Sequence, residues 1–276
     1  MPIDDERKMF LKIFDSLTGS RNRWHIWRDM ITMIACAISN TVDKQRFDER
    51  ESLYMDAAKQ YKPEELEKFA QLYGLLVLIM DRRMQENSWG DFFGELFMEM
   101  NLGSDIGGQF FTPYHVCLLC AQIGVDTGKI SGDIERSGYA EIAEPAAGAG
   151  AMLIAAAEVM KDNGIDFQRD VLFSAQEIDA TTAMMCYIQL SLLGCAGYVV
   201  IGNTLTEPSD ADPLYGEESA RCWKTPMFFA DEWALRRFGR KHRKAFGTVP
   251  EAPEEDQRDS IKVTESDEGQ IMFDLG

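Results

Sequence analysis

The chain has 276 residues, and 45% of them are apolar, which suffices for one large globular domain with a helical extension. Its formal net charge of -18 argues against strong DNA binding by this chain alone, because nonspecific affinity for nucleic acid comes mostly from Lys and Arg. No apolar run is long enough to span a bilayer and no secretory leader is recognisable, so we expect a cytoplasmic protein that does not enter a membrane.

The first hundred residues are predicted to be helical. Apolar residues recur at helical spacing from Phe69 to Met80, after Pro63, which suits the first turn of a helix. Trp24 to Ile38 forms a second long apolar-rich segment. Basic residues from Arg21 to Arg28 surround two tryptophans there; a charged helix face is the common explanation for such a cluster, and phosphate contact is the alternative. We expect a helical N-terminal domain over residues 1–104.

The segment from Gln109 to Pro113 leads into another helix, for which Thr112 is a candidate cap and Pro113 a first-turn residue. A helix start of this kind favours an anionic ligand. His115, Cys117 and Cys120 follow, but no second cysteine pair lies at zinc spacing. We therefore expect these thiols to pack in a helix, the six cysteines of the chain to be reduced, and no metal to be bound.

From about residue 105 the pattern changes to alternating strands and helices. The sequence predicts strands at 139–143, 171–176 and 197–201, with helices at 151–161 and from Asp179 or Thr181 to Leu193. Such alternation indicates a parallel sheet covered by helices. The turn from Glu144 to Gly150 joins the first strand to a helix, and Gly148 and Gly150 permit backbone conformations and close approaches that a Cβ would obstruct.

Polar side chains follow the next two strands. Glu177 comes about 30 residues after the glycines, where an acid binds ribose hydroxyls in dinucleotide folds, and Asn203 follows the third strand. The carboxyl ends of parallel strands meet at one edge of the sheet, so we expect these residues to lie around one nucleotide-like ligand. The carboxamide of Asn203 can pair with an adenine edge.

In this order, Gln109 to Pro113, Glu144 to Gly150, Glu177 and Gly202 to Leu205 resemble four motifs of the adenine-N6 DNA methyltransferases. The resemblance covers roughly residues 1–205. It is strongest to the modification subunits of type I restriction-modification systems and their phage and mobile-element relatives. The residues that it assigns to a pocket for S-adenosyl-L-methionine are Phe111, Thr112, Pro113, Glu144, Pro145, Gly148, Gly150, Glu177 and Asn203.

In that assignment, Phe111 to Pro113 border the methionine part, Glu177 binds the ribose and Asn203 the adenine. The implied fold class is α/β, a Rossmann-like methyltransferase sheet in a domain over residues 105–246, shortened after its third strand, with the helical N-terminal domain attached. Another Rossmann-like nucleotide binder is the alternative.

The (N/D/S)PP(Y/F/W) tetrapeptide, which orients the target amine and stacks on the flipped base in active family members, has no intact copy here. Asp212, Pro213 and Tyr215 retain the acid, one proline and the aromatic ring, and are our candidates for catalysis. Thr225 to Phe228 retains less of this chemistry. Ordinary turns are the alternative for both segments.

Residues 247–276 are predicted to be an acidic, flexible tail. Gln270 to Phe273 is similar to the short peptide by which bacterial replication and repair proteins contact the sliding clamp, although one residue shorter. Fold-back packing or no role at all remain alternatives.

Three functional hypotheses follow. The first is a DNA methyltransferase that acts on adenine N6 and obtains part of its DNA affinity from a partner subunit. The second is a catalytically silent, cofactor-binding regulatory or scaffold subunit of a DNA-modification or phage system. The third moves the methyl group to RNA or protein.

Overall fold

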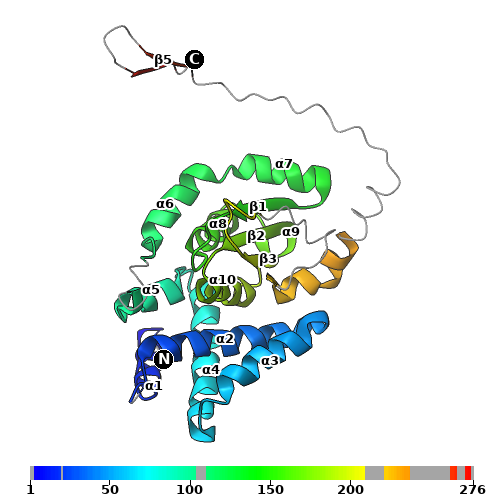
Figure 1. The fold of residues 1–276 in the computed structure, drawn as a ribbon. Coiled ribbons are helices and arrows are strands. Elements are labelled where there is room, and N and C mark those ends of the chain that lie inside the picture. The colour runs from blue at the N-terminus through cyan, green and yellow to red at the C-terminus, as the bar shows by residue number, and fades with distance from the viewer. Residues whose placement is uncertain are drawn as a thin grey trace. The chain divides into compact units, whose positions relative to one another are not determined.

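The computed structural model describes residues 3–19, 21–103, 110–208, 221–236, 262–265 and 271–274 (Figure 1). Met1–Lys241 and His242–Gly276 form separate compact units. In the second unit, β5 (Lys262–Glu265) pairs antiparallel with β6 (Ile271–Asp274). Most of the tail predicted over residues 247–276 lies outside the described residues, so its flexibility stays a prediction.

The helical character predicted for the first hundred residues is confirmed. Five α-helices occur there among the described residues: α1 (Ile3–Asp15), α2 (Arg23–Val42), α3 (Phe47–Ala58), α4 (Pro63–Gln85) and α5 (Phe92–Glu99), with a short 3-10 helix, η1 (Lys44–Arg46), before α3. Pro63 occupies the first turn of α4 as predicted, and Glu65 accepts a hydrogen bond from the Lys62 N–H at 2.8 Å. Pro63 has no N–H to leave unpaired, so these residues begin α4 without loss of a backbone hydrogen bond.

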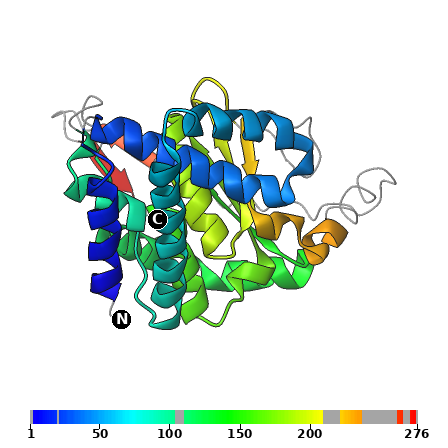
Figure 2. The same cartoon turned by 90° about the horizontal axis from the view of Figure 1, so that it is seen from below.

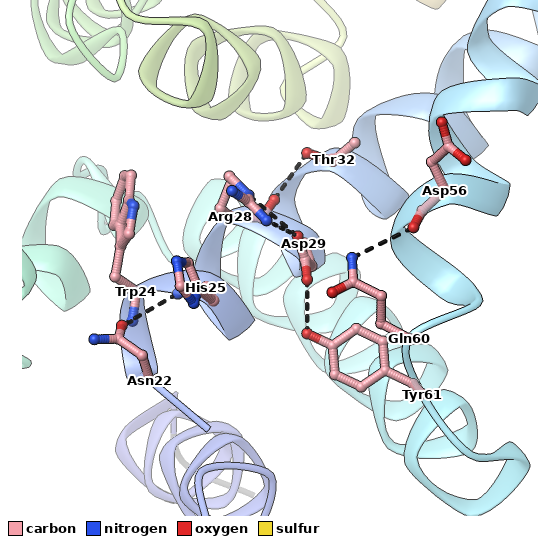
Figure 3. A network of polar contacts seen from close by, with 9 residues as sticks. All are labelled: Asn22, Trp24, His25, Arg28, Asp29, Thr32, Asp56, Gln60 and Tyr61. Atoms are coloured by element: carbon pink, nitrogen blue, oxygen red, sulfur yellow. Dashed lines mark hydrogen bonds and ion pairs between the residues drawn. The ribbon is translucent and has the colours of Figure 1, made fainter. Parts of the chain in front are cut away.

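A buried polar network joins α2 to the loop before α4 (Figure 3). The carboxylate of Asp29, only 4% exposed, accepts a hydrogen bond from the Tyr61 hydroxyl at 2.8 Å and from the Arg28 guanidinium at 2.9 Å. Burial, followed by this hydrogen bond to a carboxylate, raises the pKa of Tyr61 above its usual range. Because both Asp29 oxygens are partnered, the network stabilises the packing of these helices instead of penalising it.

Removal of the Tyr61 hydroxyl is expected to lower the free energy of unfolding. Tyr61→Phe leaves one buried oxygen of Asp29 without a donor, which costs about 1–3 kcal/mol. Chemical denaturation followed by circular dichroism measures the change. Tyr73→Phe is the control, because no hydrogen bond of the Tyr73 hydroxyl is recorded among the described residues; equal losses in the two variants would contradict the role given to the network.

The α/β part contains a four-stranded sheet in the order β1 (Ala140–Glu144), β2 (Val171–Glu177), β3 (Ala196–Ile201), β4 (Cys222–Lys224). The first three strands are parallel, and α8 (Ala151–Asp162), α9 (Phe167–Asp170) and α10 (Ala180–Leu192) connect them. Upstream lie α6 (Tyr114–Gly124) and α7 (Thr127–Ser137); downstream lie the 3-10 helix η3 (Pro226–Phe229) and a helical turn at 231–236. The predicted α/β class, with a Rossmann-like but short sheet and a helical N-terminal part, is confirmed.

Local capping agrees with the strand and helix limits that the sequence predicts. Asp179, and not Thr181, caps α10, since its carboxylate accepts a hydrogen bond from Thr182 N at 2.8 Å. Gly164 and Gly194 adopt φ of 77° and 73° after α8 and α10. A positive φ at these positions ends a helix at little cost for glycine.

The N-terminal helices and the α/β part share one hydrophobic core. Helix α10 packs on α2 on one side and on β3 on the other, and Thr181 through Leu190 are all buried. In the view from below (Figure 2), the blue and cyan N-terminal helices lie across the green α/β part. A helix that is buried on every side needs cover on both faces, so the N-terminal helices supply the layer that α10 requires.

Candidate functional site

The parallel strands bring the predicted cofactor segments to one edge of the sheet. Glu177 lies opposite Ile201, so β2 and β3 end level with each other, and Glu144 lies opposite Ala175, so β1 ends two residues earlier at the same edge. Gly202 N donates to the Glu177 carbonyl at 2.9 Å, and Ala147 N donates to the Gln176 carbonyl at 2.9 Å. The loops after all three strands are therefore connected at this carboxyl edge.

The glycine turn requires both of its glycines. Gly148 and Gly150 have φ of 55° and 100°, and Gly150 occupies the cap position of α8. A Cβ on Gly150 would lie 3.0 Å from the Cys186 Sγ, in the helix beneath the turn. Glycine avoids this contact and tolerates both φ values, and the turn places the amino end of α8 at the carboxyl edge, where an anionic group is favoured.

Glu177 bridges two of these loops. Its carboxylate accepts a hydrogen bond from Gly148 N at 2.9 Å and another from Asp179 N at 3.0 Å. A carboxylate offers about four acceptor positions, so this side chain can still bind hydroxyl donors. Glu144 behaves similarly within its own turn, because its carboxylate accepts from Ala146 N at 3.1 Å.

The loop after β3 reaches back to the glycine turn. Thr204 donates from its hydroxyl to the Pro145 carbonyl, and the Asn203 side-chain oxygen accepts from Leu205 N at 2.9 Å. The latter bond holds the Asn203 carboxamide in place and uses its oxygen, which leaves its N–H groups to donate. Ile178 and Leu205 are 64% and 92% exposed.

The structure places Phe111 beside the turn. Its ring lies edge-on to Phe97 of α5 with 5.0 Å between centroids, and 3.7 Å from the place where a Gly148 Cβ would be. Thr112 and Pro113 are exposed. The predicted cap was wrong: α6 begins at Tyr114 with Pro113 in the cap position, and it has no side-chain cap because the proline side chain carries no hydrogen-bond acceptor. Gln109 lies outside the described residues.

Asp212, Pro213 and Tyr215 also lie outside the described residues, but the chain on both sides of their segment is described. The carbonyl of Glu207 accepts from the Gln176 side chain at 2.8 Å, and the Glu207 carboxylate pairs with the Arg221 guanidinium. The Arg221 carbonyl accepts from Ile201 N at 3.0 Å. The connection that contains the three candidates thus leaves and rejoins the sheet at the carboxyl edge.

The second candidate tetrapeptide, Thr225 to Phe228, lies at the opposite edge of the sheet. Strand β4 is antiparallel to β3, so the chain runs away from the cofactor loops before it reaches Thr225. The Thr225 hydroxyl donates to the Cys195 carbonyl at 2.7 Å, and Phe228 is buried with Tyr139 and Trp233. This segment packs the amino ends of the strands and is remote from the cofactor loops.

Several other sequence expectations have a structural outcome. The arginines of the N-terminal basic cluster form ion pairs with acids, which matches a charged helix face. The pairs are Arg21 with Glu65, Arg23 with Asp15, and Arg28 with Asp29. All six cysteines are free thiols; Cys117 is buried in α6 as expected, whereas Cys120 is exposed, so the expected packing was wrong for that thiol. No cluster of metal-ligating side chains occurs among the described residues. Within the same ranges, no helix has the length and hydropathy needed to cross a bilayer.

Sequence reasoning missed Ile178. It directly follows the acid of the second strand and is exposed, although most large apolar side chains of this part are buried. An apolar residue immediately after the strand-end acid is the signal that could have singled it out, since exposed apolar side chains beside polar groups are typical of ligand sites.

Comparison with known protein families identifies the same part of the chain that contains the carboxyl-edge loops. A model of the N-6 DNA methylase family matches residues 85–259. The match begins at the end of α4 and not at the start of the chain, so it covers α5, the carboxyl-edge loops and β4 but leaves out most of the N-terminal helices. Because it spans well over half of the sequence and includes every loop at the carboxyl edge, the chain belongs to the N-6 DNA methylase family.

Proposed function

We propose that this chain is a DNA methyltransferase that uses S-adenosyl-L-methionine and acts on adenine N6. The observation that carries the proposal is the meeting of the glycine turn, Glu177 and the Asn203 loop at one edge of the sheet, linked by hydrogen bonds. Nucleotide-like ligands bind at this edge of open α/β sheets. Membership of the N-6 DNA methylase family supports the choice of ligand and of substrate.

The carboxyl edge fits this cofactor in three respects. The glycine turn places the amino end of α8 at this edge, where the carboxylate of the methionine part would be favoured. Glu177 retains acceptor positions for the ribose hydroxyls. Ile178 and the Asn203 N–H groups offer an apolar face and donors for the adenine ring. The cofactor supplies an activated methyl group, and these residues bind and orient it.

We assign the target base to the connection between Glu207 and Arg221. Asp212 would accept a hydrogen bond from the exocyclic amine of adenine, and Tyr215 would stack on the flipped base. Both attachment points of the connection lie at the carboxyl edge, which supports this segment over Thr225 to Phe228. With only Pro213 in place of the usual pair of prolines, the segment departs from the family pattern, and this departure favours the silent regulatory subunit as the second candidate.

A partner subunit would supply much of the DNA affinity, as in type I restriction-modification systems and related phage or mobile-element systems. The net charge of -18 supports this assignment, and so does the pairing of the N-terminal arginines with acids. The sliding-clamp contact through Gln270–Phe273 stays a prediction: Ile271–Asp274 form β6, and Gln270 lies outside the described residues.

The decisive experiment combines calorimetric titration of S-adenosyl-L-methionine with transfer of a tritiated methyl group to unmethylated bacterial DNA. We expect the wild type to bind the cofactor and to transfer the methyl group, and Asp212→Ala to lose at least about a hundredfold in transfer with unchanged cofactor affinity. Asp210→Ala is the matched control, because it removes a neighbouring acid outside the tetrapeptide.

Each result separates the hypotheses. Absence of cofactor binding at millimolar concentration would refute both the enzyme and the silent subunit. Binding without transfer, also after addition of the cognate partner, would establish the silent subunit. Transfer that survives Asp212→Ala would refute our catalytic assignment, and label on RNA or protein would change the substrate class.

A further inference from the structure

We propose that Asp91 and Gln189 form a buried positioning pair that holds the glycine turn in its ligand-binding conformation. The identity of the ligand in this inference rests on the proposed function, whereas the contacts between Asp91, Gln189 and the turn all involve residues that the structure describes. Neither residue belongs to the loops at the carboxyl edge. Asp91 precedes α5, and Gln189 lies near the end of α10, in the middle of the shared core.

Gln189 is fully buried and all of its hydrogen-bonding groups are used. Its side-chain nitrogen donates to the Ala149 carbonyl at 2.8 Å and to the Asp91 carboxylate at 2.7 Å. Its side-chain oxygen accepts from Phe93 N at 3.4 Å. The carboxamide therefore has one orientation available. A flip would turn its oxygen toward the Asp91 carboxylate and the Ala149 carbonyl, which are both acceptors, and no donor would remain between them.

The bond to Ala149 acts on the backbone of the turn itself. The Ala149 carbonyl shares a peptide plane with the nitrogen of Gly150, whose φ is 100°. A peptide group is rigid, so whatever fixes the direction of this carbonyl also fixes the orientation of the Gly150 N–H. The Gly150 N–H in turn bonds to the Ala147 carbonyl at 2.8 Å and closes the turn.

Asp91 holds Gln189 in place. It caps α5 by accepting from Gly94 N at 2.8 Å, yet it is only 2% exposed, whereas capping acids are usually at the surface. Its second oxygen is buried without a hydrogen-bond partner among the described residues, and burial raises the pKa of this carboxyl. A Cβ on Gly94 would lie 2.0 Å from that oxygen, so the carboxyl group is tightly confined. A capping role alone does not explain such costly burial.

Helix α5 thereby supports both walls of the proposed pocket. Its cap reaches the turn at Ala149 through Gln189, and Phe97 on the same helix packs against Phe111, which lies beside Gly148. The pair thus couples the position of α5 to the conformation of the turn.

The test separates capping from positioning. Asp91→Ser keeps a good helix cap but withdraws the acceptor from Gln189, while Asp91→Asn keeps both the cap and the acceptor. Asp126→Ser is the matched control, because Asp126 caps α7 through Lys129 N at 2.9 Å and has no recorded bond to Gln189. Two measurements are made on each folded variant: amide hydrogen exchange of residues 147–154 without ligand, and calorimetric affinity for S-adenosyl-L-methionine.

In Asp91→Ser we expect the amide hydrogens of the turn to exchange faster and S-adenosyl-L-methionine to bind about tenfold more weakly, because one supporting hydrogen bond is lost. Asp91→Asn and Asp126→Ser should remain close to the wild type in both measurements. Unchanged exchange at the turn in Asp91→Ser, or an equal change in Asp126→Ser, would overturn the inference. If the wild type binds no cofactor, the proposed function fails, while the exchange measurement still decides the positioning role.

Discussion

Glu177→Ala is expected to weaken binding of S-adenosyl-L-methionine by at least about a hundredfold. The substitution removes the carboxylate that we assign to the ribose, and hydrogen bonds to a charged group are worth about 1.5–3 kcal/mol each. It also frees the N–H groups of Gly148 and Asp179, which this carboxylate holds at 2.9 and 3.0 Å. The loss therefore combines a missing ligand contact with a looser turn. Calorimetric titration measures it directly.

The control for Glu177→Ala is Asp162→Ala, which makes the same change of charge at the exposed far end of α8. It should bind the cofactor like the wild type, because an exposed charge at that distance is screened by salt. A Glu177→Ala variant that keeps full affinity would contradict the ribose assignment. Equal losses in both variants would point to net charge as the cause.

Gly150→Ala is expected to abolish cofactor binding and to lower the melting temperature. An alanine at φ of 100° is strained, at a cost of about 1–3 kcal/mol, and its Cβ would lie 3.0 Å from the Cys186 Sγ. The turn escapes this strain only by a change of its backbone, which misdirects the N–H groups at the start of α8. Thermal denaturation and calorimetric titration test the two effects.

Gly74→Ala provides the matched control for Gly150→Ala. Gly74 lies inside α4 and nothing stands within 4 Å of an added Cβ, so alanine should stabilise the protein by about 0.5–1 kcal/mol. The double variant Gly150→Ala with Cys186→Ala tests the steric part, because it relieves the contact but not the dihedral strain. A Gly150→Ala protein with wild-type stability and affinity would show that the turn does not need its glycine.

Several short-range physical signals in the sequence predicted the local structure correctly. Pro63 begins α4 and Asp179 caps α10, because each acts on the backbone of its own neighbours. The parallel strands followed from the alternation of strands and helices. The meeting of Glu177 and Asn203 at one edge followed from the topology of such a sheet.

Thr112 and Thr225 mark the limits of this reasoning. Thr112 is a residue type that commonly caps helices, but Pro113 occupies the cap position and α6 begins at Tyr114. Thr225 to Phe228 resembles a degenerate catalytic segment, and only the antiparallel direction of β4 removes it from the cofactor loops. Strand direction depends on long-range hydrogen bonds that no short motif records.

The sequence by itself thus determined the α/β class, the three parallel strands with the helices that follow the first two, and the helical character of the first hundred residues, because these depend on residue type and on spacing along the chain. The tertiary structure alone decided that the N-terminal helices and the α/β part share a core, that Thr225 faces away from the site, and that Asp91 reaches the glycine turn through Gln189. These contacts join residues far apart in the sequence, such as Asp91 and Gln189, which are separated by 98 positions, and they depend on packing that local patterns do not encode.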